Sequence, residues 1–217
     1  YSIKSHCINA TSSTGCIHAN VYLGVGDVVI QNSANSGVGQ AVIQIAAARK
    51  LRTINIIRDR PNLSEVSDQL KLMGATEVVT EEFAQSYRMK SVIEQMGEPT
   101  LALNGVGGKS SLTLLRLLAD GGTMVTYGGM SRQPITVPTG SLIFNDKSIQ
   151  GFWMTRWSKS STQSDRQKML NSLYEYIRSG SLKTVLHGTW KLQDFHAAVT
   201  EAMQPFHAKK QIFINET

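Results

Sequence analysis

The chain has 217 residues, of which 41% are hydrophobic and 18% charged, so it is long enough to bury a sizeable core. Lys and Arg outnumber Asp and Glu by 22 to 16, but these basic residues are spread along the chain rather than gathered beside aromatic ones. This composition favours a soluble globular protein with an anionic small ligand, and disfavours nucleic-acid binding. No apolar run approaches the ~20 residues of a membrane span.

The cysteines and histidines do not form a metal or disulfide framework. Cys7 and Cys16 lie at a separation untypical of a zinc site, and no two histidines share the H-x-x-x-H spacing. We therefore expect no metal site and a reducing compartment. The chain begins at Tyr1 without Met or an obvious targeting segment, which predicts that an N-terminal region precedes it.

From Asp27 onward, apolar segments of strand length alternate with helical patterns. Strands are expected at residues 28–30, 53–57, 77–80, 101–104, 123–127, 148–154 and 211–214. Helices are expected at residues 38–50, from Pro61 to Gly74 with Ser64 as a cap, and at residues 87–96, 110–118, 164–178 and 195–203. This alternation predicts right-handed crossovers and an α/β fold, a doubly wound parallel sheet of the Rossmann type.

The first expected strand leads through a tight turn into a helix. Residues 34–39 align with the dinucleotide fingerprint G-x-G-x-x-G but keep only its last glycine, Gly39, where the helix must pack closely on the strand. Ala34 and Ser36 replace the other two glycines, and Gly37 restores some backbone freedom. Amides at a helix N-terminus bind phosphate, so the turn is a candidate pyrophosphate site, although any strand–helix turn could give so loose a match.

A short charged segment, Arg58-Asp59-Arg60, follows the second expected strand. In dinucleotide-binding folds an acid at this place accepts hydrogen bonds from the ribose hydroxyls, whereas arginine accommodates the 2′-phosphate of NADP. Two guanidiniums flanking one acid favour NADP. Asp59 lies about 20 residues after Gly39, where an NAD-binding acid is expected, so NAD and a merely solvated loop remain alternatives.

Residues 127–130, Tyr-Gly-Gly-Met, stand at the carboxyl end of the fifth expected strand. Open α/β sheets bind ligands beyond those ends, and glycines there let the backbone contact a nicotinamide and its ribose, although an ordinary turn could have the same residues. Residues 105–110 contain Gly-Lys-Ser, but Leu103 stands where a P-loop needs its first glycine, so we reject that site. No nucleophile–base signature such as G-x-S-x-G is present, and hydride transfer needs none because a cofactor carries the chemistry.

Four segments together resemble the mitochondrial trans-2-enoyl thioester reductases, zinc-free members of the medium-chain dehydrogenase/reductase superfamily. They are residues 32–46, 58–61, 107–111 and 122–130. The resemblance implies a homodimer of the mitochondrial matrix that uses NADPH to reduce the 2,3 double bond of enoyl thioesters, on acyl carrier protein or CoA, in fatty acid synthesis. It also implies a cofactor domain over residues 24–183, with remnants of a catalytic lobe at residues 1–23 and 184–217.

The same resemblance carries over a set of cofactor contacts and no metal ligand. The phosphate turn comprises Asn35, Ser36, Gly37, Val38 and Gly39, and the 2′-phosphate clamp comprises Arg58, Asp59 and Arg60. The nicotinamide side comprises Tyr127, Gly128, Gly129, Met130, Phe152, Trp153, Met154 and Thr155. Two further contacts, Asn9 and Lys210, stand apart from these groups. A proton-donor tyrosine is expected in the missing part of the catalytic lobe, so no catalytic residue is assigned. Residues 149–157 resemble the strand through which cofactor domains dimerise. The alternatives are a non-catalytic NADPH-binding or dimerisation module and a quinone reductase of the same superfamily.

Overall fold

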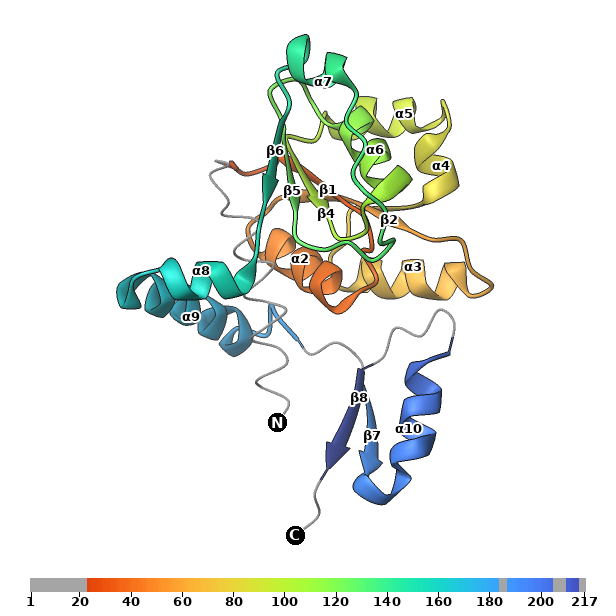
Figure 1. Ribbon diagram of the computed structural model, residues 1–217, viewed down its shortest axis with the longest axis vertical. Helices are drawn as coiled ribbons and strands as arrows, with labels where there is room; N and C mark the ends of the chain where they lie inside the picture. Colours follow the sequence, from red (N-terminus) through yellow and green to blue (C-terminus); the bar gives the residue numbers. More distant parts are fainter. Residues whose placement is uncertain (1–22, 184–186, 205–209, 215–217) are drawn as a thin grey trace.

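The computed structural model describes residues 23–183, 187–204 and 210–214, so the candidate contact Asn9 lies outside the described residues. The described chain contains a six-stranded sheet and a separate two-stranded sheet (Figure 1). Within this part of the chain, no helix is both long and apolar enough to cross a bilayer.

All strands of the larger sheet are parallel, in the order β3-β2-β1-β4-β5-β6. Their bounds are β1 Val28–Gln31, β2 Arg52–Ile57, β3 Glu77–Thr80, β4 Leu101–Asn104, β5 Thr123–Thr126 and β6 Ser148–Gly151. The chain builds outward from β1 to one edge, returns to the centre at β4 and builds outward to the other edge. This confirms the doubly wound α/β fold and places the reversal of strand order between β1 and β4.

Helices cover both faces of this sheet (Figure 1). One face carries α2 Gly37–Ala48 and α3 Leu63–Leu72, and the other carries α4 Glu81–Gln85, α5 Met89–Met96 and α6 Gly108–Leu117. With apolar layers on both sides, the central strands β1 and β4 are buried along their whole length.

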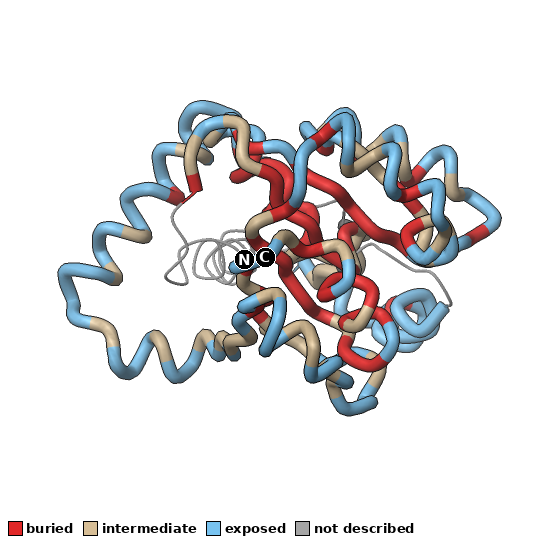
Figure 2. Tube along the Cα trace, turned by 90° about the horizontal axis from the view of Figure 1, so that it is seen from above, coloured by how far each residue is buried: buried red, intermediate tan, exposed pale blue. Residues whose placement is uncertain are grey.

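Side chains along β1 alternate between the two apolar layers, as the period of a strand requires. Val29 belongs to the layer that includes Val42 of α2. Val28 and Ile30 belong to the opposite layer, with Leu114 of α6. Figure 2 shows the buried residues concentrated in the central strands, so the core lies on the sheet itself.

Beyond β5 the chain forms α7 Thr139–Ile143, the edge strand β6, and then α8 Met154–Ser160 and α9 Gln163–Arg178. Leu173 anchors α9 to the layer beneath α2, while most of α8 and α9 is exposed. The small sheet pairs β7 His187–Lys191 with β8 Lys210–Ile214 in parallel, joined by α10 Phe195–Ala202 after a short 3₁₀ turn at Leu192–Asp194. It lies apart from the six-stranded sheet in Figure 1.

Several boundaries expected from the sequence are wrong. The strand expected at residues 148–154 ends at Gly151, because the β5–β6 ladder ends there, and Met154 already begins α8. Ser64 is not a cap: α3 begins at Leu63 after Asn62, which makes no side-chain cap bond. The helix expected at residues 87–96 is present as α5, which begins at Met89. The short helix α4 before it was not predicted, and Thr80 caps it by accepting from the Phe83 amide at 3.1 Å.

Candidate functional site

Strands β1, β2, β4 and β5 are each followed by a turn, and these four turns lie together at the edge of the sheet formed by the carboxyl ends of the strands. In a doubly wound fold the ligand crevice lies outside those ends, at the reversal of strand order. The sequence-predicted phosphate turn follows β1, the charged segment follows β2, and residues 127–130 follow β5. Parallel strands therefore bring all three predicted segments to the same edge.

The turn after β1 is built to begin α2. Ser33 has a left-handed backbone conformation with φ of 53°, which reverses the chain after the buried strand. The Ser36 side chain then caps the helix by accepting from the Gly39 amide at 3.1 Å. An anion at this helix N-terminus would meet the amide of Gly37 and the positive end of the helix dipole.

Gly39 brings α2 into close contact with this turn, whereas the sequence predicted that the glycine would let the helix pack closely on the strand. A Cβ atom at Gly39 would lie 2.5 Å from the carbonyl oxygen of Ala34 and 2.6 Å from that of Ser33. Both are backbone atoms, so a side chain could enter only if the helix moved away from the turn. The glycine therefore fixes how closely the helix approaches the candidate phosphate site.

Substitution of Gly39 by alanine tests this close approach. We expect Gly39→Ala to lower the free energy of unfolding by about 1–3 kcal/mol, because the added methyl group overpacks a backbone contact. Urea denaturation measures the change. Gly24→Ala is the control, since a Cβ there meets only Asp27 Oδ2, at an ordinary contact distance of 3.8 Å, and its free energy of unfolding should stay within about 0.5 kcal/mol of the unsubstituted chain. Equal stability of the two variants would contradict the role given to Gly39.

The charged segment after β2 places its two arginines differently. Arg58 and Asp59 are exposed, whereas Arg60 is 6% exposed. Arg60 Nε donates to the carbonyl oxygen of Arg58 at 3.3 Å. Of the two orientations of the Asn35 side-chain amide, the one that turns its oxygen toward the guanidinium satisfies both groups, and in that orientation the oxygen accepts from the two terminal nitrogens of Arg60 at 3.2 and 3.3 Å. Burial, followed by the nearby charge of Arg58, lowers the pKa of Arg60. Arg60 thus ties the charged segment to the phosphate turn.

The turns after β4 and β5 pack tightly against each other. The amides of Tyr127 and Gly128 both donate to the carbonyl oxygen of Asn104, at 3.0 and 3.4 Å, and the Met130 amide donates to that of Gly105 at 3.2 Å. A Cβ at Gly128 would lie 2.9 Å from the Gly105 carbonyl oxygen. These glycines let two backbone segments meet at the edge where a ligand would lie.

The other predicted cofactor contacts, residues 152–155 and Lys210, lie outside these turns. Phe152 packs, like Val38 and Tyr127, against the apolar layer beneath α2. Trp153 is 62% exposed, with the Arg156 guanidinium 5.8 Å from its ring. Met154 and Thr155 begin α8. Lys210 begins β8 in the small sheet, and its side chain is not among those described.

A set of buried amide side chains in and after the strands forms contacts that were not predicted from the sequence. Gln31 Nε2 donates to the Gly39 carbonyl oxygen at 3.0 Å and to Asn55 Oδ1 at 2.8 Å, and Asn32 Nδ2 donates to Asn104 Oδ1 at 2.9 Å. The available signal was a polar residue in or directly after an apolar strand: Gln31 and Asn104 end β1 and β4, Asn32 follows β1, and Asn55 lies within β2. Because a buried amide needs partners, such residues mark positions where the structure fixes its turns.

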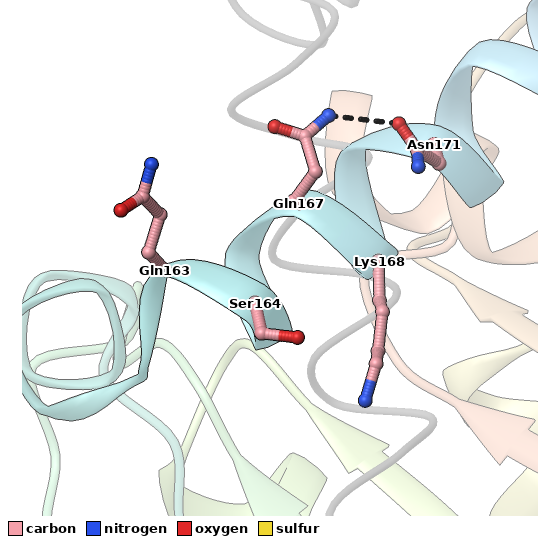
Figure 3. Close-up of a pocket in the computed structure, with 5 residues that line it drawn as sticks. All are labelled: Gln163, Ser164, Gln167, Lys168 and Asn171. Carbon is pink, nitrogen blue, oxygen red and sulfur yellow. Dashed lines mark hydrogen bonds between the residues drawn. The ribbon is translucent and has the colours of Figure 1, made fainter.

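A polar hollow of about 400 Å³ lies on α9, away from these turns (Figure 3). All five side chains that line it come from the one helix, and two of them bond each other, Gln167 Nε2 donating to Asn171 Oδ1 at 2.8 Å. Such a one-sided surface does not converge on a ligand. Within the described residues, no group of three or more His, Cys, Asp or Glu side chains could hold a metal ion.

The parallel doubly wound sheet, with a capped helix N-terminus after β1 at the reversal of strand order, defines a Rossmann-type α/β domain. The chain belongs to the zinc-binding dehydrogenase family, whose model matches residues 37–174. It is also homologous to the mitochondrial enoyl-[acyl-carrier-protein] reductases, which confirms the resemblance seen in the sequence.

The human enzyme of that name is 50% identical over 187 residues, which cover 86% of this chain and 50% of the human protein. The Caenorhabditis elegans enzyme is 45% identical over 192 residues, covering 88% of this chain and 54% of its own length. The chain therefore spans about half the length of the curated relatives it matches.

Two kinds of solved structure are similar to this chain. The complex of Etr1p with NADP and crotonyl-CoA superposes with a TM-score of 0.86 at 34% identity, over 97% of this chain and 60% of that one. A quinone reductase of Bacillus thuringiensis superposes with a TM-score of 0.83 at 19% identity, over 97% of this chain and 63% of that one, which shows a shared fold alone.

Proposed function

We propose that this chain supplies the NADPH-binding part of an enoyl thioester reductase. The whole enzyme would reduce the 2,3 double bond of trans-2-enoyl groups, carried on acyl carrier protein or CoA, during fatty acid synthesis in the mitochondrial matrix. The contact between Arg60 and Asn35 carries the proposal, because it joins an arginine-bearing segment to a candidate phosphate turn. The names of the relatives support the substrate class and the location, and Etr1p has been solved with NADP and crotonyl-CoA.

The described residues fit such a cofactor. The first turn of α2 would bind the pyrophosphate, and exposed Arg58 would bind the 2′-phosphate bidentately. Gly129 leaves open space, since a Cβ there meets nothing within 4 Å, so a nicotinamide ring could approach the backbone. Bound NADPH would supply hydride to the β-carbon, and a tyrosine of the catalytic lobe would supply the proton to the α-carbon.

We further propose that residues 24–183 form the cofactor domain and that residues 1–23 and 184–217 belong to the catalytic lobe. Two such domains would pair through residues 149–157. The edge strand β6 supports this pairing, because its end residues Ser148 and Gly151 are exposed and its outer edge has no neighbour in the described sheet.

A non-catalytic NADPH-binding or dimerisation module is the second candidate. The observation that favours it is the outer edge of β6, which has no neighbour in the described sheet and could pair with a second copy. The quinone-reductase alternative rests on the shared fold alone, at 19% identity.

Turnover and binding measurements separate these functions. NADPH and crotonyl-CoA are incubated with the chain while the loss of NADPH absorbance is followed, and NADPH is titrated separately. Oxidation that depends on crotonyl-CoA would support the reductase and refute the module. Binding of NADPH without oxidation would support the cofactor site, which the module shares with the cofactor part of a reductase. A folded chain that does not bind NADPH at millimolar concentration would refute both.

A further inference from the structure

Asn104 is a fully buried amide at the end of β4, in a strand that is otherwise apolar. Its Oδ1 atom accepts from Asn32 Nδ2 at 2.9 Å, from the Val106 amide at 3.1 Å and from the Gly107 amide at 2.9 Å. Its Nδ2 atom donates to Thr126 Oγ1, at the end of β5, at 3.2 Å. One side chain therefore connects the ends of the three central strands.

Asn32, the residue directly after β1, completes this cluster. Its Oδ1 atom accepts from the Gly105 amide at 2.8 Å, and its Nδ2 atom also donates to Ser110 Oγ at 3.1 Å. Together the two asparagines hold the three consecutive amides of the turn after β4. The turn after β4 also binds residues 130–131: the Gly105 carbonyl oxygen accepts from the Met130 amide, and the Val106 carbonyl oxygen accepts from the Ser131 amide.

Burial of an amide in an apolar strand is costly unless all of its hydrogen bonds are made, and a fully bonded cluster fixes a single backbone geometry. Apart from the bond to Asn32, the side-chain bonds of Asn104 go to the turn after β4 and to Thr126 at the end of β5. Its carbonyl oxygen accepts from the amides of Tyr127 and Gly128 after β5, so most of its bonds lie on the β4–β5 side of the reversal of strand order. In a doubly wound fold, each half of the sheet binds one of the two mononucleotides of the dinucleotide. With the candidate phosphate turn and Arg58 on the β1–β2 side, the β4–β5 side receives the nicotinamide half.

We propose that Asn104 is a positioning residue that sets the paired turns after β4 and β5 for the nicotinamide half of NADPH. This inference rests on the proposed function, because it takes NADPH as the ligand. It predicts an effect on one half of the cofactor site, whereas a general structural role would affect both halves.

The test compares two ligands by calorimetric titration of the full chain: NADPH, and adenosine 2′,5′-bisphosphate, which lacks the nicotinamide half. Asn104→Ala should raise the Kd for NADPH about tenfold, because three buried donors lose their acceptor, and should leave the Kd for the bisphosphate within about twofold. Thr126→Val is a nearly isosteric change that removes one hydrogen bond of Asn104. It should also raise the Kd for NADPH, by a smaller factor than Asn104→Ala. Thr123→Val, at the opposite end of β5, should change neither constant.

Each outcome has a distinct meaning. An equal rise in both Kd values, or no rise in either, for Asn104→Ala would overturn the positioning role. If that variant does not fold, Thr126→Val decides between the same outcomes. Failure of the unsubstituted chain to bind either ligand would refute the proposed function itself, whereas normal binding by that chain with unselective variants would refute only this inference.

Discussion

Arg58→Ala should raise the Kd for NADPH by about tenfold to a hundredfold while changing the Kd for NADH less than about threefold. Arg58 is exposed directly after β2, the position from which arginine reaches a 2′-phosphate in this fold. Hydrogen bonds to a charged group contribute about 1.5–3 kcal/mol, and NADH lacks the phosphate that would accept them. Titration of both coenzymes measures the selectivity.

A matched control separates the local contact from the overall loss of charge. Arg52 lies at the opposite end of the same strand and is also exposed, so Arg52→Ala removes the same charge far from the crevice. We expect Arg52→Ala to leave the ratio of the two Kd values unchanged, since salt screens charges over about 10 Å. Equal effects of Arg58→Ala on NADPH and NADH would refute the assignment of the 2′-phosphate site.

The sheet of this protein was largely predictable because its strands are short apolar runs separated by amphipathic helices. Residues 101–104 and 77–80 were predicted with their observed bounds. The errors occurred where apolar composition does not decide between helix and strand. The run Phe152-Trp153-Met154 would suit either a helix or a strand. It leaves the sheet because β5, its neighbour among the described strands, ends at Thr126. At five residues, α4 is too short to show a helical period.

The candidate site was predictable as segments but not as contacts. Turn composition and strand order indicate that residues 34–39 and the segment beginning at Arg58 should meet at one edge. That Arg60 turns inward to Asn35, while Arg58 stays exposed, depends on side-chain packing between segments distant in the sequence. The sequence placed both arginines in one 2′-phosphate clamp, with Arg58 at the discriminating position, and the structure gives the two side chains different surroundings.

Arg60→Ala should therefore lower stability and weaken both coenzymes, whereas Arg58→Ala should weaken NADPH selectively. The Arg60 side chain is buried against the phosphate turn, and removal would leave the Asn35 amide oxygen and the Arg58 carbonyl oxygen without these bonds. We expect the free energy of unfolding to fall by about 1–3 kcal/mol. Because the pyrophosphate is common to both coenzymes, a loosened turn should weaken NADPH and NADH by similar factors, roughly tenfold each.

Arg60→Lys distinguishes the geometry of the guanidinium from its charge. Lysine keeps the positive charge but presents a single ammonium group, which cannot reach the Asn35 oxygen and the Arg58 carbonyl oxygen with a planar set of donors. If Arg60 acts by holding the turn, Arg60→Lys should resemble Arg60→Ala in urea denaturation and in both titrations. If lysine restores NADPH affinity without restoring stability, then Arg60 acts as a charge on the 2′-phosphate, and the contact with Asn35 does not organise the turn.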